Sequence, residues 1–259
     1  MRDLRVTLVQ TMLHWEDAEA NRVMFAEKLA ALKGTTDLIV LPEMFTTGFS
    51  MRSKELAETM DGATVKWMTE QACSLDAAIC GSVIIADAGN YFNRGLFVTA
   101  LGQVTVYDKR HLFRMAEEKD NYARGQKRVI VELNGWRILL QVCYDLRFPV
   151  FARNRSDYDA IIYAANWPEA RRFPWSQLLI ARAIENQCCV IGVNRVGMDG
   201  KGHHYTGDSV AIDAKGQVFA ACDAGQERII TCSLDRTALD DFREKFPVGK
   251  DADDFELKP

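Results

Sequence analysis

Short apolar runs and longer amphipathic stretches follow each other along most of the 259 residues of this chain. Runs of four to eight apolar residues that end at turn residues are typical of buried β-strands, whereas longer periodic stretches are typical of helices. The apolar runs predict strands at residues 4–10, 38–41, 78–85, 95–99, 104–107, 129–133, 136–142, 160–165, 189–194, 209–212, 218–221 and 228–233. The periodic stretches predict helices at residues 17–32, 64–75, 148–154, 174–187 and 236–245. This alternation indicates a layered α/β protein.

Turn residues between some of the predicted strands indicate that neighbouring strands run antiparallel. Asn134 and Gly135 suit a type I′ turn, and Gly216 can adopt the positive φ of a second hairpin. These hairpins argue against a wholly parallel sheet, so two mixed sheets packed together with helices outside fit the pattern better. No segment resembles a linker, which predicts a single domain over residues 1–249. The polar, acidic residues 250–259 are expected to form a weakly ordered tail or an arm that embraces a second copy.

Composition narrows the class of partner. The hydrophobic fraction of 48% supports a sizeable core, and a net charge of −4 provides no basic footprint for nucleic acid or for an anionic membrane. Small-molecule chemistry is therefore the expected activity. Seven cysteines without C-x-x-C spacing suggest reduced thiols rather than a disulfide framework or a zinc site. Since the chain also has no signal-like or membrane-spanning apolar stretch, we expect a cytoplasmic protein without a metal or other cofactor.

Cys143 is the first candidate for chemistry, because it lies where the apolar run of residues 136–142 ends. Pro149 cannot continue a central strand but suits the first turn of a helix, so Cys143 is expected on a strand-to-helix elbow with unpaired backbone N–H groups nearby. Such N–H groups stabilise a thiolate and can hold an oxyanion. A cysteine in an apolar context is more often an inert core residue, so this segment alone leaves both interpretations open.

Two further apolar runs end in chemically complementary residues. Glu43 follows residues 38–41 and Pro42, and Lys109 follows the alternating residues 104–107. A lysine at a strand end is most often only a solvated edge residue. In α/β sheets, however, strand ends gather around the ligand crevice, and Glu43, Lys109 and Cys143 together would form a site.

With these residues the chain resembles the nitrilase, or carbon-nitrogen hydrolase, superfamily, whose members carry a Glu-Lys-Cys triad in this order at strand ends. Residues 164–168 and 182–187 are similar to the family's segments after the nucleophile, and the resemblance runs from about residue 4 to residue 246. It implies a four-layer αββα sandwich of two mixed β-sheets flanked by helices, commonly a homodimer paired across one helical face. The segments after Pro42 and Cys143 look most like the omega-amidase branch, which hydrolyses the terminal amide of 2-oxoglutaramate.

The resemblance also implies catalytic roles. Glu43 would take the proton of Cys143, and Lys109 with the backbone N–H of Tyr144 would stabilise the oxyanion that forms when the thiolate attacks an amide. Lys109 and the N–H groups of the elbow are expected to raise the fraction of thiolate.

A second glutamate often accompanies the family's triad, eight or nine residues after the lysine. Glu117 and Glu118 both have this spacing, and we expect Glu118 to be the one. The alternative is that both are solvated acids on a loop.

Substrate-binding residues are expected close to the nucleophile. A carboxylate on the substrate would need a cationic anchor, for which Arg147 is the first candidate and for which Arg171 and Arg172 are alternatives. Arg147 could instead pair with Asp145. Aromatic residues in the same segments are candidates for the pocket walls, namely Phe45, Phe49, Tyr144 and Trp167.

Other functions remain open at this stage. The same triad could serve a nitrile, an N-carbamoyl compound or deaminated glutathione, and a scaffold protein could use the fold without catalysis. A dinucleotide-binding protein is disfavoured because no G-x-G-x-x-G follows the first strand. His203 and His204 follow a glycine-rich segment, residues 197–202, which predicts a loop and no metal site.

Overall fold

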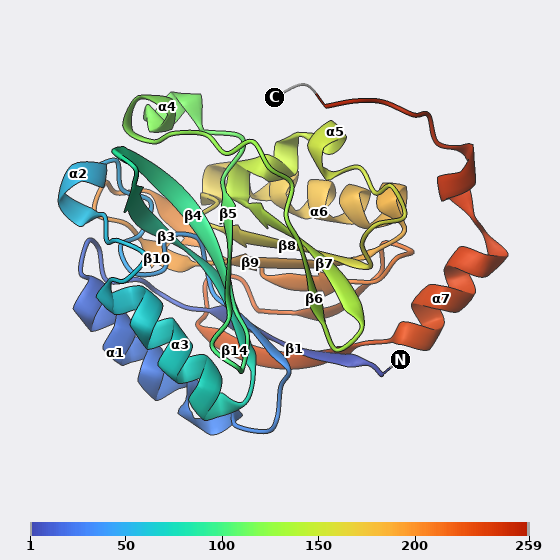
Figure 1. Cartoon of the computed structure of the whole chain (residues 1–259), viewed down its shortest axis with the longest axis horizontal. Coiled ribbons are helices and arrows are strands. Elements are labelled where there is room, and N and C mark those ends of the chain that lie inside the picture. The colour runs from blue at the N-terminus through green and yellow to red at the C-terminus, as the bar shows by residue number, and fades with distance from the viewer. Residues whose placement is uncertain (1, 258–259) are drawn as a thin grey trace.

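The computed structural model describes residues 2–257, which are built around two six-stranded sheets (Figure 1). The first sheet has the strand order β14 (Arg228–Leu234), β1 (Leu4–Gln10), β2 (Leu38–Val40), β3 (Ala78–Asp87), β4 (Asn90–Val98) and β5 (Val104–Asp108). The second has the order β13 (Val218–Ala221), β12 (Val210–Ile212), β9 (Cys189–Asn194), β8 (Ala160–Ala165), β7 (Trp136–Val142) and β6 (Ile130–Leu133). A separate hairpin consists of β10 (Val196–Met198) and β11 (His204–Thr206).

Both sheets are mixed, with a parallel centre and antiparallel edges. In the first sheet β1, β2 and β3 run parallel, and in the second β7, β8 and β9 run parallel. Parallel strands are buried on both faces, which explains why their sequences are continuous apolar runs. The antiparallel strands β4, β5, β6, β12, β13 and β14 follow through hairpins or long connections.

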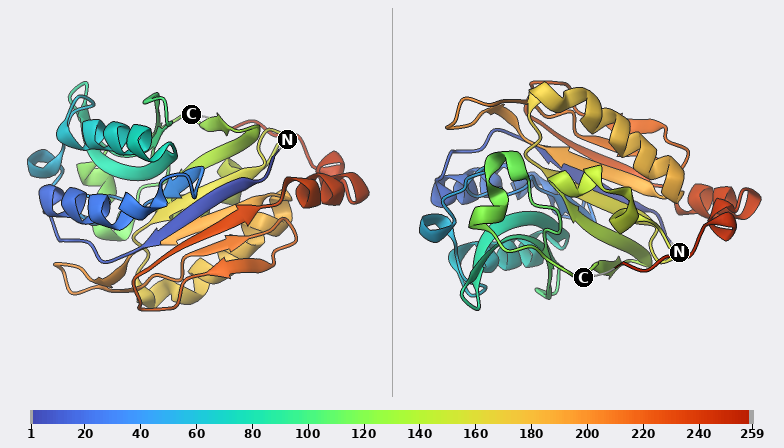
Figure 2. Two further views of the ribbon diagram at one scale, coloured as in Figure 1. Left: turned by 90° about the horizontal axis from the view of Figure 1, so that it is seen from below. Right: turned by 90° about the horizontal axis from the view of Figure 1, so that it is seen from above.

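Helices lie on the outer faces of the paired sheets. Figure 2 shows α1 (Ala18–Leu29) and α3 (Ala63–Leu75) on one side and α6 (Arg172–Asn186) on the opposite side. This four-layer arrangement confirms the predicted αββα sandwich. Short helices connect the layers: α2 (Ser53–Leu56), α4 (Glu118–Asn121), α5 (Pro149–Ala152) and the 3₁₀ turns Ala30–Leu32, Arg114–Ala116, Cys143–Arg147, Glu169–Arg171 and Val248–Asp251.

Alternation along the strands divides the apolar residues between two cores. In β2, Leu38 and Val40 belong to the core between the sheets, whereas Ile39 packs with the outer layer of α1 and α3. On the other side, α6 comes so close to β9 that a Cβ atom at Gly192 would lie 2.7 Å from Leu179. The strand therefore needs glycine at this position.

The last helix, α7 (Arg236–Lys245), is joined to the second sheet by a buried carboxylate. Asp159 at the start of β8 is 1% exposed and accepts hydrogen bonds from Arg137, Arg236 and Arg243. Burial alone would raise the pKa of Asp159, but the hydrogen bonds from Arg137 and Arg243 outweigh it and hold the pKa at about 2. The ionised carboxylate therefore stabilises the docked helix down to acidic pH.

Several elements differ from the predicted ones. Strand β4 begins at Asn90 rather than residue 95, because its first half carries polar residues such as Asn93 that conceal the strand. The predicted helix at 148–154 is shorter, and α2 and α4 were not predicted. The segment 197–202, predicted as a loop, is in part the hairpin β10–β11.

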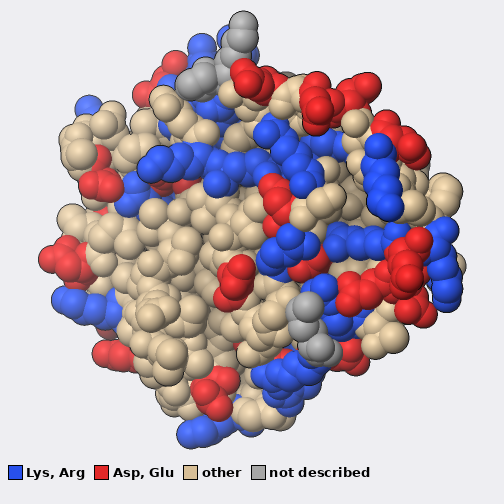
Figure 3. All heavy atoms as spheres, turned by 45° about the vertical axis from the view of Figure 1, so that its right-hand side comes forward, with Lys and Arg blue, Asp and Glu red and all other residues tan. Residues whose placement is uncertain are grey.

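The surface and the C-terminal segment complete the description. Basic and acidic side chains are interleaved over much of the face drawn in Figure 3, next to an area with few charges. No helix within residues 2–257 is long and apolar enough to cross a membrane. After α7 the chain continues along the protein, where the ring of Phe255 lies 4.6 Å from the Arg155 guanidinium and Leu257 packs against the core. Whether this segment acts as an arm between two copies stays a prediction.

Candidate active site

Three strand ends bring Glu43, Lys109 and Cys143 together. Glu43 follows β2, Lys109 follows β5 and Cys143 follows β7, so both sheets contribute to the same point. Glu43 and Lys109 are fully buried and Cys143 is 7% exposed. Lys109 Nζ lies 2.8 Å from Glu43 Oε1. A carboxylate, an ammonium and a thiol thus meet in a nearly dry environment, where charges interact strongly.

Cys143 occupies a tight elbow. Its φ of +45° is unusual for a residue with a side chain, and it starts the 3₁₀ turn that leads to Pro149 at the first position of α5. The N–H of Tyr144 belongs to the start of this 3₁₀ turn, Cys143–Arg147, where backbone N–H groups have no partner within the turn. The elbow therefore presents the sulfur together with an N–H group, as an acyl-transfer site requires.

A buried carboxylate connects the elbow to the strand end that carries Lys109. Asp145 is fully buried, and its Oδ2 accepts hydrogen bonds from Tyr107 Oη at 2.7 Å and from the Val142 N–H at 3.0 Å. Its Oδ1 accepts the His111 N–H at 2.9 Å and lies 2.7 Å from His111 Nδ1. Because Tyr107 and His111 flank Lys109 in sequence, Asp145 fixes the position of the lysine relative to the elbow.

Glu118 joins the cluster, and Glu117 does not. Glu118 is fully buried at the start of α4, with Oε1 at 2.9 Å and Oε2 at 3.0 Å from Lys109 Nζ. The Phe113 N–H also donates to Glu118 Oε2. Glu117 is exposed and has a φ of +59° at the end of the preceding 3₁₀ turn.

Burial and charge set the protonation of the resting site. Burial, together with the nearby Glu43, raises the pKa of the Cys143 thiol well above its usual range despite the opposing effect of Lys109. Burial would lower the pKa of Lys109, but the charges of Glu118 and Glu43 raise it. Lys109 acts in the expected direction, since it lowers the pKa of the thiol, but burial outweighs it in the free protein. Cys143 rests as a thiol beside an ammonium.

A small cavity opens above Cys143. Its volume is about 60 Å³, and its walls include Phe49, Tyr144, Trp167 and Arg147, four residues expected to bind substrate. The Phe49 ring centroid lies 5.1 Å from Lys109 Nζ. Several aromatic walls combined with a few polar groups are typical of a small-molecule site.

Comparison with known proteins identifies the group to which this site belongs. The family model described as carbon-nitrogen hydrolase matches residues 5–244. This chain belongs to the carbon-nitrogen hydrolase family. It is 50% identical over 257 residues to omega-amidase YafV of Escherichia coli K12, covering 99% of this chain and 100% of that protein. It is 33% identical to the 2-oxoglutaramate amidase of Bacillus subtilis, covering 83% of this chain and 84% of the relative.

A solved structure agrees with these matches. XC1258 from Xanthomonas campestris, a CN-hydrolase superfamily protein with an arsenic adduct in its active site, superimposes with a TM-score of 0.98 at 48% identity. The match covers 100% of both chains. The resemblance to the omega-amidase branch, predicted from the residues after Pro42 and Cys143, is thereby confirmed, and the chain is an enzyme.

Two arginines face the cavity of this carbon-nitrogen hydrolase. The Arg147 guanidinium lies 5.2 Å from the centroid of the Trp167 ring, and the Arg171 guanidinium lies 5.0 Å from that of Phe113. Neither forms an ion pair with a carboxylate of the described residues; in particular, Arg147 does not pair with Asp145, which is occupied by Tyr107 and His111. Both cations are therefore available to a ligand.

Two other candidates lie outside the cavity. Arg172 forms an exposed ion pair with Asp208, at 2.7 Å and 2.9 Å, and so is not a substrate anchor. Phe45 is fully buried in the outer core, with its ring centroid 5.4 Å from that of Phe25. Its place as a pocket wall was wrong, because the chain turns between Phe45 and Phe49 and only the latter reaches the cavity.

The hairpin β10–β11 contributes walls that the sequence did not reveal. Tyr205 and His203 line the cavity, and Tyr205 Oη donates to Asp199 Oδ2 at 2.9 Å. The buried Arg195 guanidinium lies 4.9 Å from the Tyr205 ring. The glycine-rich sequence of this hairpin lacks a strand pattern, and only the pairing of β10 with β11 places Tyr205 near Cys143. Residues 2–257 contain no group of three or more His, Cys, Asp or Glu side chains that could hold a metal ion.

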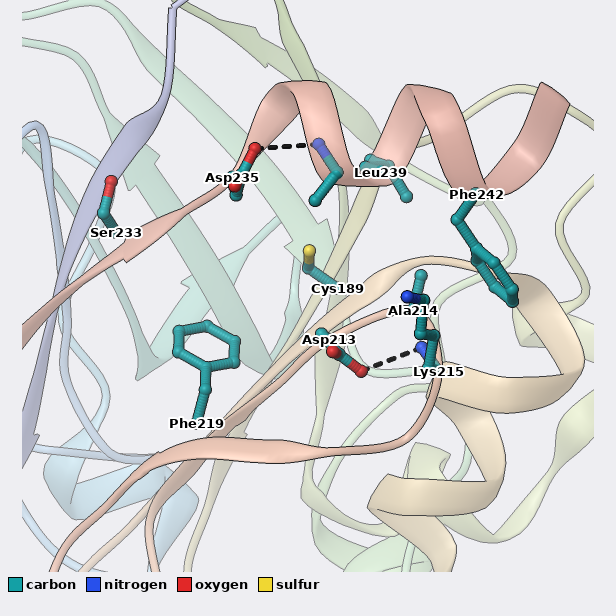
Figure 4. Close-up of a pocket in the computed structure, with 10 residues that line it drawn as sticks. Cys189, Asp213, Ala214, Lys215, Phe219, Ser233, Asp235, Leu239 and Phe242 are labelled. Atoms are coloured by element: carbon teal, nitrogen blue, oxygen red, sulfur yellow. Dashed lines mark hydrogen bonds between the residues drawn. The ribbon is translucent and has the colours of Figure 1, made fainter. Parts of the chain in front are cut away.

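A second cavity of about 260 Å³ lies far from this chemistry, between α7 and the strands β9, β13 and β14 (Figure 4). Its carboxylates have local structural roles: Asp235 caps α7 through the Ala238 N–H, and Asp213 accepts the Lys215 N–H in the turn before β13. Burial raises the pKa of Cys189 at its base to about 12. The cavity therefore presents no reactive group.

Proposed function

We propose that this chain is an omega-amidase that hydrolyses the terminal amide of a small dicarboxylic acid monoamide such as 2-oxoglutaramate. The single observation that carries the proposal is the position of Arg147, a guanidinium without a carboxylate partner among the described residues, in the same cavity as Cys143. Similarity to omega-amidase YafV over nearly the whole chain supports the same assignment.

The first half of the reaction forms a thioester. Glu43 accepts the thiol proton as the Cys143 sulfur attacks the amide carbonyl carbon, and the carbonyl oxygen becomes an oxyanion. Lys109 Nζ and the Tyr144 N–H donate to that oxyanion. When the C–N bond breaks, Glu43 returns the proton to the nitrogen, which leaves as ammonia.

The second half hydrolyses the thioester. A water molecule attacks the thioester carbonyl, and Glu43 accepts one of its protons. The same donors hold the second oxyanion, and the C–S bond then breaks as Cys143 recovers the proton from Glu43. The product is the dicarboxylic acid, whose new carboxyl group loses its proton to solvent. Glu118 keeps the ammonium of Lys109 in place during both halves, at 2.9 Å and 3.0 Å.

The carboxylate at the far end of the substrate would lie between Arg147 and Arg171. Arginine binds carboxylate through two parallel N–H donors, and the stacking on Trp167 and Phe113 leaves the edges of both guanidiniums available. A neutral amide would leave two cations without a partner at the mouth of a small cavity. Selection for an anionic amide follows from this arrangement.

Ammonia release by the purified protein tests the proposal. The panel comprises 2-oxoglutaramate and succinamate, a neutral aliphatic amide of similar length, a nitrile, an N-carbamoyl acid and deaminated glutathione. We expect the first two to have the highest kcat/KM. Equal or faster turnover of a nitrile or a neutral amide would refute the omega-amidase assignment, and absence of turnover on every substrate would favour a scaffold role.

Two further expectations concern the state of the protein. A homodimer paired across α5 and α6 is supported by exposed apolar side chains on these helices: Val150, Phe173 and Ile184 are 55%, 74% and 52% exposed. Sedimentation of the wild type beside Ile184→Glu tests it, since a monomeric wild type would contradict pairing.

Seven free cysteines support a reducing compartment such as the cytoplasm. Fractionation of the native host tests that location, and recovery outside the cytoplasm would contradict it.

A further inference from the structure

One neutral side chain bridges the two glutamates of the site. Asn93, in the middle of β4, is fully buried, and its Nδ2 lies 2.7 Å from Glu43 Oε1 and 3.1 Å from Glu118 Oε1. Apart from Lys109, it is the only side chain of the described residues that donates hydrogen bonds to both carboxylates. Asn93 does not line the cavity above Cys143, so it acts behind the catalytic groups.

The orientation of the Asn93 amide follows from its partners. The Met44 N–H donates to Ser82 Oγ at 2.8 Å, so the hydroxyl proton of Ser82 is directed to Asn93 Oδ1, also at 2.8 Å. A flipped amide would place its oxygen against two carboxylates, which would repel it. The hydrogen bonds from Met44 through Ser82 to Asn93 therefore present the NH₂ group of Asn93 to the glutamates.

The site needs such a donor because its charges do not balance. Two carboxylates and one ammonium share a volume without solvent, and like charges at this distance favour uptake of a proton by one carboxylate. Burial, with a contribution from Glu43, raises the pKa of Glu118. The other titratable groups facing the pair are Lys109, Cys143 and Tyr122. Hydrogen bonds to an ionised carboxylate oppose this proton uptake.

We propose that Asn93 is a positioning residue that keeps Glu43 aimed at the thiol and keeps a proton from settling on the Glu43–Glu118 pair, by donating to both carboxylates at once, with Ser82 fixing its orientation. This inference rests on the proposed function of the site. Loss of the amide leaves Lys109 to neutralise both carboxylates, so the pair takes up a proton at higher pH. Glu43 then fails as a base under conditions where the wild type is active.

Asn93→Leu tests the inference because it keeps the branched shape of the side chain and removes the donor. We expect the acidic limb of the kcat/KM profile to move up by about one pH unit, a tenfold change in proton affinity equal to about 1.4 kcal/mol. On the acidic side of the limb kcat should fall by up to about tenfold, while KM changes less than about threefold. Ser82→Ala, which removes only the orienting hydroxyl, should shift the limb in the same direction by a smaller amount.

Alkylation of Cys143 by iodoacetamide, followed against pH by peptide mass spectrometry, provides a readout that needs no substrate. The pH at which the alkylation rate falls should rise in both variants, even if the true substrate is another amide. Asn186→Leu is the matched control: within residues 2–257 the side-chain hydrogen-bond partners of this buried asparagine at the end of α6 are Arg182, Glu185 and Asn154, all outside the site, so stability falls without a shift of either profile. If Asn93→Leu folds and its profiles are not shifted, the proposal is overturned. If Asn93→Leu does not fold, unshifted profiles of Ser82→Ala overturn it.

Discussion

Replacing Arg147 by Met should convert the enzyme from one that prefers anionic amides to one that does not. Methionine keeps an unbranched side chain over the Trp167 ring and removes the guanidinium. Since Arg147 has no internal carboxylate partner among residues 2–257, its full interaction is available to the substrate. A hydrogen bond to a charged group contributes roughly 1.5–3 kcal/mol, which corresponds to a loss of about 10- to 150-fold in kcat/KM. Arg171 can take over part of the interaction, so we expect a value near the lower limit.

The assay is a double comparison of ammonia release. The wild type and Arg147→Met are each measured with succinamate and with butyramide, which has the same chain length without the carboxylate. The variant should lose at least about tenfold with succinamate and less than about twofold with butyramide. Arg172→Met is the matched control, since Arg172 pairs with Asp208 outside the cavity. Equal losses on both amides, or no loss with succinamate, would refute the anchoring role of Arg147.

Three further predictions concern the triad and the stability of the fold. Cys143→Ala should abolish turnover, whereas Cys73→Ala, at an exposed thiol, should retain it, so retained activity in the former would contradict the assignment. Glu43→Gln and Lys109→Met should each lower kcat at least about 100-fold with unchanged circular dichroism, because each removes a charge needed in the transition state. The pKa of Asp159 falls from 3.8 to about 2 on folding, so Asp159→Asn should lose about 2 kcal/mol at pH 7. That stability is present above pH 4 and is lost as the pH falls toward 2. Urea unfolding that shows the same difference between the wild type and Asp159→Asn at pH 7 and near pH 2 would contradict the reasoning.

The parts of the site that end apolar runs could be predicted from the sequence. Glu43, Lys109 and Cys143 each follow a strand whose residues are buried on one or both faces, and a strand end is a position that local pattern reveals. Glu118 was different: nothing in its own segment separates it from Glu117, and only the resemblance to a family favoured it. The two are distinguished in three dimensions, because the turn at Glu117 directs one side chain outward and the next inward.

Other parts depend on contacts that no local pattern contains. Asn93 lies in a strand whose polar residues conceal it, and its importance comes from two glutamates 50 and 25 residues away. Tyr205 reaches the cavity only through a glycine-rich hairpin. In both cases the function of the residue is set by long-range packing, which composition and periodicity do not encode.

The protonation of Cys143 shows how burial changes the chemistry expected from the same residues. A lysine beside a thiol favours the thiolate in water, but here Lys109 already faces two carboxylates at 2.8 Å and 2.9 Å. A resting thiolate would add another negative charge to a cluster whose one cation within residues 2–257 is Lys109, at a cost that desolvation increases. In the proposed mechanism the proton therefore leaves the sulfur as the carbonyl is attacked, when the new negative charge moves to an oxygen that Lys109 would stabilise.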